Sequence, residues 1–369
     1  MSIILFLIIL IVLILVHEFG HFIVAKKSGI RVDEFGIGFP PRIKGWKKGE
    51  TTYTLNWIPF GGFVKIAGED VTDEELSVMS AKERDRNFAL KPAAIKAAVI
   101  VAGVAFNFLL AWVLFSVGYM TGLPVPVDES GAEEGLRDVA LVITGVQEGA
   151  AAEEAGLNPG DKILSLVADD GRGVPDLTTD AVREFIATRP GATLTLTYER
   201  EGETASATLS PRESAELERA VIGITMDRIG TLEASPLEAI GRGFIMTARV
   251  TGATVSGLYS LVKNALTGEG SFADVSGPVG IVRIVGDAAR FGFAYLIGLT
   301  AVISVNLAVL NLLPFPALDG GRLLFLLIEK LKGSPIKPAI ANTANMIGFY
   351  ALIILMLVVT YHDVVKLFR

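Results

Sequence analysis

The chain has 369 residues, of which 51% are hydrophobic, and its mean hydropathy is +0.52. That hydropathy indicates a membrane protein rather than a water-soluble one. There is no cysteine, which excludes disulfides and thiolate metal ligands. The net charge of −7, with no basic patch, argues against nucleic acid as a partner.

Residues 1–24 are predicted to form the first of four transmembrane helices. The apolar run from Ser2 to Ala25 is long enough to cross about 30 Å of hydrocarbon. Its length favours a span over the alternative, a cleaved signal peptide. Within it stands LVHEFGHFIVA, residues 15–25, which places His17, Glu18 and His21 where each ionisable group is costly.

Residues 25–92 are predicted to lie on the cytoplasmic side of the membrane. Residues 25–48 hold seven Lys or Arg and two acids, an excess that is typical of cytoplasmic loops. The stretches 32–43 and 51–70 predict two short hairpins. This segment contains four aromatic residues, Trp46, Trp57, Phe60 and Phe63. Aromatic rings are favoured at the membrane interface, so they predict that the loop re-enters the interface. An ordinary soluble hairpin is the alternative.

Residues 93–123 form the second predicted span, and residues 124–235 form a separate outer domain. That domain is strongly acidic, with 22 acidic and nine basic residues. Because successive spans cross the membrane in alternate directions, it is expected on the outer side. Alternating runs at 140–146, 162–167, 193–199 and 205–210 predict strands. Residues 180–188 predict a helix capped by Asp180. The domain is therefore expected to be of mixed β/α class.

The segment GAAAEEAGLNPGDKIL, residues 149–164, closely resembles part of bacterial PDZ domains. VIGIT at 221–225 is similar to their peptide-binding loop. The resemblance implies that Ile222, Gly223 and Ile224 bind an extended peptide by adding it as a strand. The alternative is a domain that acts only as a steric cap.

Residues 236–290 are predicted to contain an interfacial amphipathic helix and a linker. The cations Arg242, Arg249 and Lys263 suit a helix that lies in the interface better than one that crosses it. Residues 291–345 hold the third span and the loop after it, and residues 346–369 hold the fourth span.

The His-Glu-x-x-His spacing points to a metal site. Two histidines four residues apart on a helix lie within about 40° of each other and can reach one ion. Neutral imidazoles bind Zn²⁺, and the intervening Glu18 is placed to handle a proton. The alternative is a buried polar pair in which the two side chains satisfy each other. The chain has only three histidines, and two of them stand here.

A catalytic zinc takes three protein ligands, so a third is expected elsewhere. Asp319 is the only acid between Asp287 and Glu329, and it follows the third span. Pro314 and Pro316 interrupt the helix there, so the chain can turn Asp319 inward. Asn107, in the second span, is interpreted as a packing residue or as a helper of the active site.

Together, HEFGH, the PDZ-like insert, SGPVGI at 276–281 and the residues 311–321 resemble the site-2 protease family of intramembrane zinc metalloproteases. Within it the chain is most similar to the bacterial regulator of sigma-E protease group. GIGFPP at 36–41 departs from the family pattern, and there is one PDZ-like domain where the sigma-E protease has two. The resemblance implies that His17, His21 and Asp319 bind zinc, that Glu18 is the catalytic base, and that Asn311, Pro314, Pro316, Gly61 and Gly62 position the substrate.

The expected function is therefore that of a zinc-dependent intramembrane endopeptidase in the bacterial cytoplasmic membrane. Its expected partners are the lipid bilayer and single-span membrane proteins, for example anti-sigma factors or remnant signal peptides. An upstream site-1 protease would make a first extracytoplasmic cut, as in regulated intramembrane proteolysis. A membrane PDZ adaptor that binds zinc without cleavage is the alternative from another class.

Overall fold

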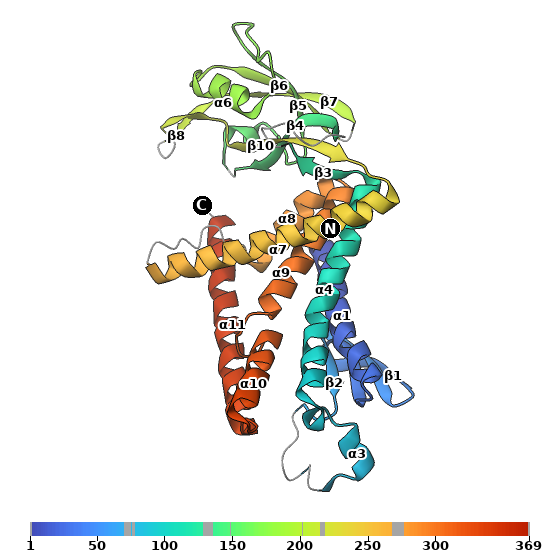
Figure 1. Ribbon diagram of the computed structural model, residues 1–369. Helices are drawn as coiled ribbons and strands as arrows, with labels where there is room; N and C mark the ends of the chain where they lie inside the picture. Colours follow the sequence, from blue (N-terminus) through green and yellow to red (C-terminus); the bar gives the residue numbers. More distant parts are fainter. Residues whose placement is uncertain are drawn as a thin grey trace. The chain divides into compact units, whose positions relative to one another are not determined.

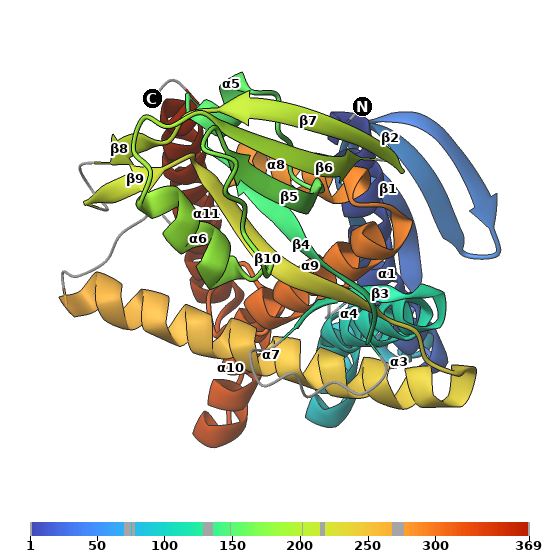
Figure 2. The same ribbon diagram turned by 90° about the horizontal axis from the view of Figure 1, so that it is seen from above.

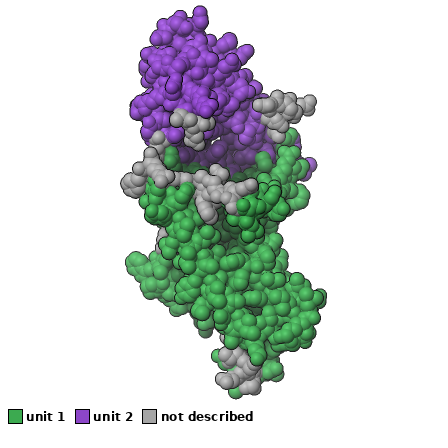
Figure 3. All heavy atoms as spheres, turned by 90° about the vertical axis from the view of Figure 1, so that its left-hand side faces the viewer, with its two compact units in different colours: residues 1–116, 240–286, 299–369 green, residues 117–239, 287–298 purple. Residues whose placement is uncertain are grey.

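The computed structural model describes residues 2–69, 75, 78–127, 136–147, 149–200, 202–214, 218–267 and 277–367. The chain divides into two compact units, which are coloured in Figure 3. Unit 1 comprises residues 1–116, 240–286 and 299–369, and unit 2 comprises residues 117–239 and 287–298. The domain expected at 124–235 lies within unit 2.

Four helices in the described part of the chain are long and apolar enough to cross a membrane (Figure 1). They match the four expected spans, but the last begins at Pro338 rather than at 346. Hydropathy misses its first turns because Asn342 and Asn345 make them polar. The four helices are α1 (Ser2–Lys27), α4 (Ala93–Thr121), α9 (Phe293–Asn311) and α11 (Pro338–Leu367), of which α11 qualifies as a span to Val365.

Helices α1 and α4 run side by side in close contact. Gly20 of α1 lies against the backbone carbonyl of Ala102, where no side chain would fit. On α4, the indole N–H of Trp112 donates a hydrogen bond to the carbonyl of Ile240 at 2.9 Å. Ile240 belongs to α7 (Pro236–Thr267), the helix expected at the interface, which is not among the four spans.

Residues 32–66 form two long strands, β1 (Val32–Lys48) and β2 (Thr51–Ile66), rather than the two short hairpins expected. Residues 52–55 pair with 34–37 and also with 44–47, and residues 62–65 pair with 34–37 as well. The strands therefore fold back on themselves. The bend includes Gly38, whose φ is +77°, and two prolines that cannot donate to a ladder. Two short helices follow, α3 (Ala81–Asp85) and η1 (Phe88–Leu90).

Helix α11 is attached to the rest of unit 1 near both of its ends. Towards its C-terminus, the carboxylate of Asp363 accepts hydrogen bonds from the backbone N–H groups of Gly277 and Gly280, at 3.1 and 2.9 Å. These groups begin α8 (Pro278–Arg290), where an acid satisfies otherwise unpaired N–H groups. Towards its N-terminus, the side-chain oxygen of Asn345 accepts a hydrogen bond from the N–H of Ala317.

Unit 2 is built on a six-stranded sheet with the order β3-β10-β4-β5-β6-β7 (Figure 2). The four strands predicted from alternating hydrophobicity are β4 to β7. Leu141, Ile143, Leu166 and Leu194 are among the residues of its buried core. The strands are β3 (Leu123–Pro126), β4 (Leu136–Val146), β5 (Lys162–Ala168), β6 (Leu194–Arg200), β7 (Glu203–Leu209) and β10 (Ile224–Leu232), and β8 (Arg212–Ser214) pairs separately with β9 (Arg219–Val221).

The helix expected at 180–188 is α6 (Thr179–Ala187), but its cap is Thr178 and not Asp180. The hydroxyl of Thr178 accepts a hydrogen bond from the N–H of Ala181 at 3.2 Å. Asp180 is the second residue of the helix, and its carboxylate accepts a hydrogen bond from Arg183 at 3.0 Å. A single turn, α5 (Ala151–Glu154), precedes β5.

An ion pair between a buried carboxylate and a partly exposed guanidinium ties the segment 149–164 to β6. Asp161 is fully buried and accepts two hydrogen bonds from the guanidinium of Arg200, at 2.6 and 2.8 Å. Its second oxygen also accepts the N–H of Asn158 at 2.8 Å. The two-point geometry and the extra donor together satisfy a carboxylate that would be costly to bury alone.

We expect Asp161→Ala to lower the free energy of unfolding of unit 2 by about 2–4 kcal/mol, because hydrogen bonds to a buried charge are lost. Thermal unfolding of the full-length chain in detergent measures the loss. Lys162→Gln is the matched control, since its ion pair with Glu199 is exposed to solvent and exposed pairs contribute about 0–1 kcal/mol. Equal stability of the two variants would contradict this role of Asp161.

Candidate metal centre

Helix α1 brings the two histidines of the HEFGH motif onto one face. Their Nε2 atoms lie 3.2 Å apart, and the rings meet edge to face with centroids 4.9 Å apart. His17 is buried in a helix that is otherwise almost wholly apolar. Unpartnered imidazoles in this position would be costly, so the arrangement favours a shared ligand.

Asp319 reaches the same point from the other end of the chain. Helix α9 ends at Asn311, and α10 (Asp319–Lys332) begins after a tightly folded loop. Gly320 and Gly321 lie against loop carbonyls, including that of Leu313, where a Cβ atom would collide. Ala317 adopts a left-handed conformation, with φ of +77°. The loop therefore directs the first residue of α10 towards α1.

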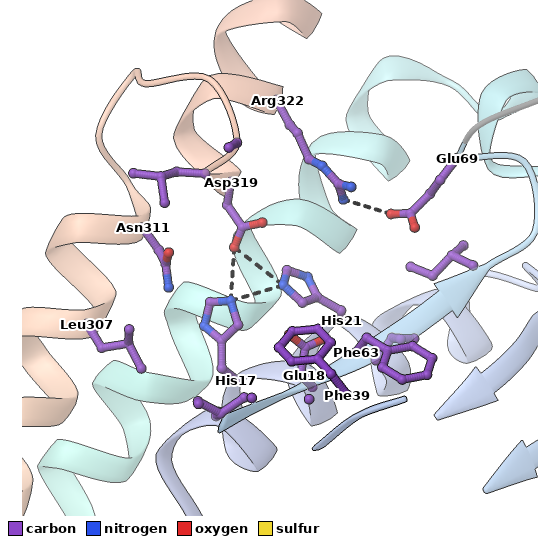
Figure 4. Close-up of a pocket in the computed structure, with 17 residues that line it drawn as sticks. His17, Glu18, His21, Phe39, Phe63, Glu69, Leu307, Asn311, Asp319 and Arg322 are labelled. Carbon is purple, nitrogen blue, oxygen red and sulfur yellow. Dashed lines mark hydrogen bonds and ion pairs between the residues drawn. The ribbon is translucent and has the colours of Figure 1, made fainter. Parts of the chain in front are cut away.

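The three candidate ligand atoms form a compact triangle (Figure 4). Oδ2 of Asp319 lies 3.1 Å from Nε2 of His17 and 3.4 Å from Nε2 of His21. Tetrahedral zinc with bonds of about 2.0–2.1 Å holds its ligands about 3.3 Å apart. In the described part of the chain, Oδ2 is buried and accepts no hydrogen bond. The donor set, its spacing and this unsatisfied oxygen all fit a zinc ion.

The charge state of Asp319 suits a metal ligand. Burial by itself would raise the pKa of its carboxyl group, but the imidazoles of His17 and His21 outweigh burial and hold the pKa well below its usual range. The carboxyl group is therefore ionised at neutral pH. A metal ligand must be deprotonated, so no proton has to be displaced from Asp319 when an ion binds.

Helix α4 packs against both histidines, a contact that the sequence largely failed to predict. Gly103 lies so close to Nε2 of both histidines that any side chain there would collide with them. The carbonyl of Val99 lies 2.8 Å from Nδ1 of His21, and the amide of Asn107 lies 3.2 Å from Nδ1 of His17. The only sequence signal was Asn107, one of few polar residues in that span.

A cavity of about 390 Å³ opens beside the triangle, and Glu18 lines it. Gly61 and Gly62 of β2 line it too, and a Cβ atom at Gly62 would come within 3.5 Å of Cγ of Glu18. Asn311 lines it from the end of α9. The structure thus brings the three candidate ligands together with four further residues, namely Glu18, Gly61, Gly62 and Asn311.

Two predicted substrate-positioning residues lie apart from this cavity. Among the residues that the structure describes, Pro314 and Pro316 are not part of its lining. The carbonyl of Pro316 instead packs against Gly348 of α11. The two prolines can therefore affect the site through the shape of the loop. At the cavity, Arg322 of α10 forms an ion pair with Glu69 at 2.8 Å, a contact that sequence reasoning did not suggest.

In unit 2, a second cavity of about 510 Å³ lies beside β10 and α6. Ile222, Gly223 and Ile224 line it, as do Arg183 and Arg219. Strand β3 pairs only with residues 229–232 of β10, so residues 224–227 have no strand partner on that edge in the described part of the chain. The predicted peptide-binding residues thus border an open strand edge.

Comparison with known proteins agrees with this geometry. The family described as Peptidase family M50 matches residues 5–355. A putative zinc metalloprotease of Clostridium perfringens is 36% identical, over 96% of this chain and 95% of its own length. A putative zinc metalloprotease of Rhizobium meliloti is 34% identical, over 98% and 96%. The zinc metalloprotease RasP of Geobacillus kaustophilus is 32% identical, over 100% and 98%. Because these matches span nearly the whole chain, it belongs to peptidase family M50, the intramembrane zinc metalloproteases of the site-2 type.

Proposed function

We propose that this protease cleaves single-span membrane proteins near the cytoplasmic face, after another protease has shortened their outer part. The observation that supports this most is the single cavity that holds the three candidate ligands, Glu18 and the glycines of β2. His17, His21 and Asp319 would bind the zinc and leave a position open for water. An open position is what separates catalytic from structural zinc sites.

Glu18 is the residue left free to move a proton. The zinc, when bound, supplies an activated water and polarises the scissile carbonyl. Glu18 lines the cavity between the histidines of its own helix, so its carboxylate can take the proton of the attacking water. It can then deliver that proton to the leaving amine. Phe39 and Phe63 line the same cavity beside Glu18 (Figure 4).

Strand β2 is the proposed receptor for the substrate backbone. A helix in the membrane has all its peptide groups hydrogen-bonded, so the substrate must unwind before its carbonyl can be attacked. Residues 62–65 pair with 34–37 on one side and have no strand on the other in the described part of the chain. An unwound segment could add there as a strand, and Asn311 could bind its peptide groups.

The proposed orientation follows from charge. The basic residues of 25–48 support a cytoplasmic position for that segment, and the alternation of the spans then assigns residues 124–235 to the outer side. We propose that the PDZ-like unit excludes substrates with bulky outer domains, and that its groove accepts an extended peptide. The open edge at residues 224–227 and the cavity beside it support the second role.

Glu18→Gln tests the catalytic role. We expect it to slow cleavage of a single-span reporter substrate by about 10²–10⁴, because general base catalysis is lost. Zinc content of the purified chain should stay the same, since Glu18 is not among the three ligands. Cleavage at the parental rate would contradict the role of Glu18, and a parental chain that does not cleave the reporter at all would favour the adaptor alternative.

Metal removal tests the ligand set. Dialysis against a chelator should abolish cleavage, and added Zn²⁺ should restore it. Asp319→Leu should remove stoichiometric zinc, because two histidines alone leave the ion too few ligands. Zinc analysis of the purified chain is the measurement. A full complement of zinc in Asp319→Leu would show that the third ligand is another residue.

Substrate length tests the filter. A reporter with a folded outer domain should be cleaved more slowly than the same reporter with that domain removed. Introducing a cleavable site between domain and span should restore fast cleavage once the site is cut. Equal cleavage of the long and short reporters would contradict the proposed filter and leave the zinc chemistry unaffected.

A further inference from the structure

The two ligand histidines differ in what their Nδ1 atoms face. Nδ1 of His21 lies 2.8 Å from the backbone carbonyl of Val99. A carbonyl can only accept, so Nδ1 of His21 carries the hydrogen and Nε2 is left with a lone pair for the metal. His21 is thus held in the form that binds zinc through Nε2.

His17 faces a group that can either donate or accept a hydrogen bond. Its Nδ1 lies 3.2 Å from the amide of Asn107, which is fully buried. The amide nitrogen faces the ring, and the amide oxygen is buried without a hydrogen-bond partner in the described part of the chain. A half-turn of the amide exchanges its two ends. The oxygen then accepts a hydrogen bond from Nδ1–H of His17, and the amide nitrogen takes the side on which the oxygen had no partner.

We propose that Asn107 is a positioning residue for the metal site, because its side-chain oxygen accepts Nδ1–H of His17 and keeps Nε2 available for zinc. Without the ion, the amide nitrogen can donate to Nδ1 while Nε2–H faces Asp319. With the ion, the turned amide accepts instead. Asparagine can pair with Nδ1 of His17 in both states without moving its backbone.

The backbone of Asn107 is itself held in place. The hydroxyl of Ser304, on α9, donates a hydrogen bond to the carbonyl of Asn107 at 2.8 Å, and both residues are fully buried. Gly103, one turn earlier on α4, lies directly against the two Nε2 atoms. One face of α4 therefore carries both Gly103, which contacts the two histidines, and Asn107, which faces Nδ1 of His17.

Two substitutions that keep the number of side-chain heavy atoms and the branching at Cγ test the proposal in the full-length chain. Asn107→Leu removes the acceptor, and Asn107→Asp keeps one. Zinc affinity is measured by competition with a chelator at neutral pH, in detergent. We expect Asn107→Leu to weaken zinc binding by about 10–100-fold, the usual cost of losing a partner of a ligand histidine. Asn107→Asp should stay close to the parental affinity.

Asn306→Leu is the matched control. Asn306 lies in α9, and its side-chain oxygen accepts a hydrogen bond from the hydroxyl of Thr254. Among the described residues it is not part of the lining of the cavity beside the ligands. Asn306→Leu should leave the zinc affinity unchanged. Parental affinity in Asn107→Leu would overturn the proposal, as would equal weakening in Asn107→Asp, which would mean that shape and not the acceptor matters. Asn107→Ala, which cannot overpack, replaces the leucine variant if that chain does not fold.

This inference rests on the zinc site and not on the proposed substrates. Its readout is metal affinity, so it can fail while the protease assignment stands. If the parental chain does not cleave the reporter and Asn107→Leu still loses zinc, the proposed function fails and the positioning role survives. The two experiments therefore distinguish the two failures.

Discussion

The structure depends on three candidate ligand atoms that lie 3.1–3.4 Å from one another in an apolar interior. Two come from α1 and the third, on Asp319, comes from a segment some 300 residues later. Such groups would be costly to bury without a partner, and a divalent ion satisfies all three at once. An ion held by His17, His21 and Asp319 would leave Glu18 as the ionisable residue of the motif that is free for proton transfer.

Close backbone approach is what lets the ligands meet. Gly20 admits α4 against α1, Gly103 leaves room for the imidazoles, and Gly320 lets the loop fold under Asp319. Each position excludes even a methyl group. Helix α11 also stabilises the loop before α10, because Asn345 accepts a hydrogen bond from the N–H of Ala317. The site is therefore a product of helix packing and not of the HEFGH motif alone.

Much of this could be predicted from the sequence. Spans are set by hydropathy, and the i, i+4 spacing of His17 and His21 already places two side chains on one face. Asp319 could be found because it is the one acid near a helix break. The folded-back pairing of β1 and β2 was missed, because the pairing partners of a strand are not encoded in its alternation alone. Asn107 stayed ambiguous, since only tertiary structure shows which polar group faces which.

The most direct test is to locate the metal itself. Anomalous scattering at the zinc edge, from crystals of the full-length chain, would give the position of the ion and its ligands. The account predicts one zinc bound by Nε2 of His17, Nε2 of His21 and Asp319, with the remaining position open to water. An ion bound elsewhere, or one closed off by Glu18 as a fourth protein ligand, would contradict it.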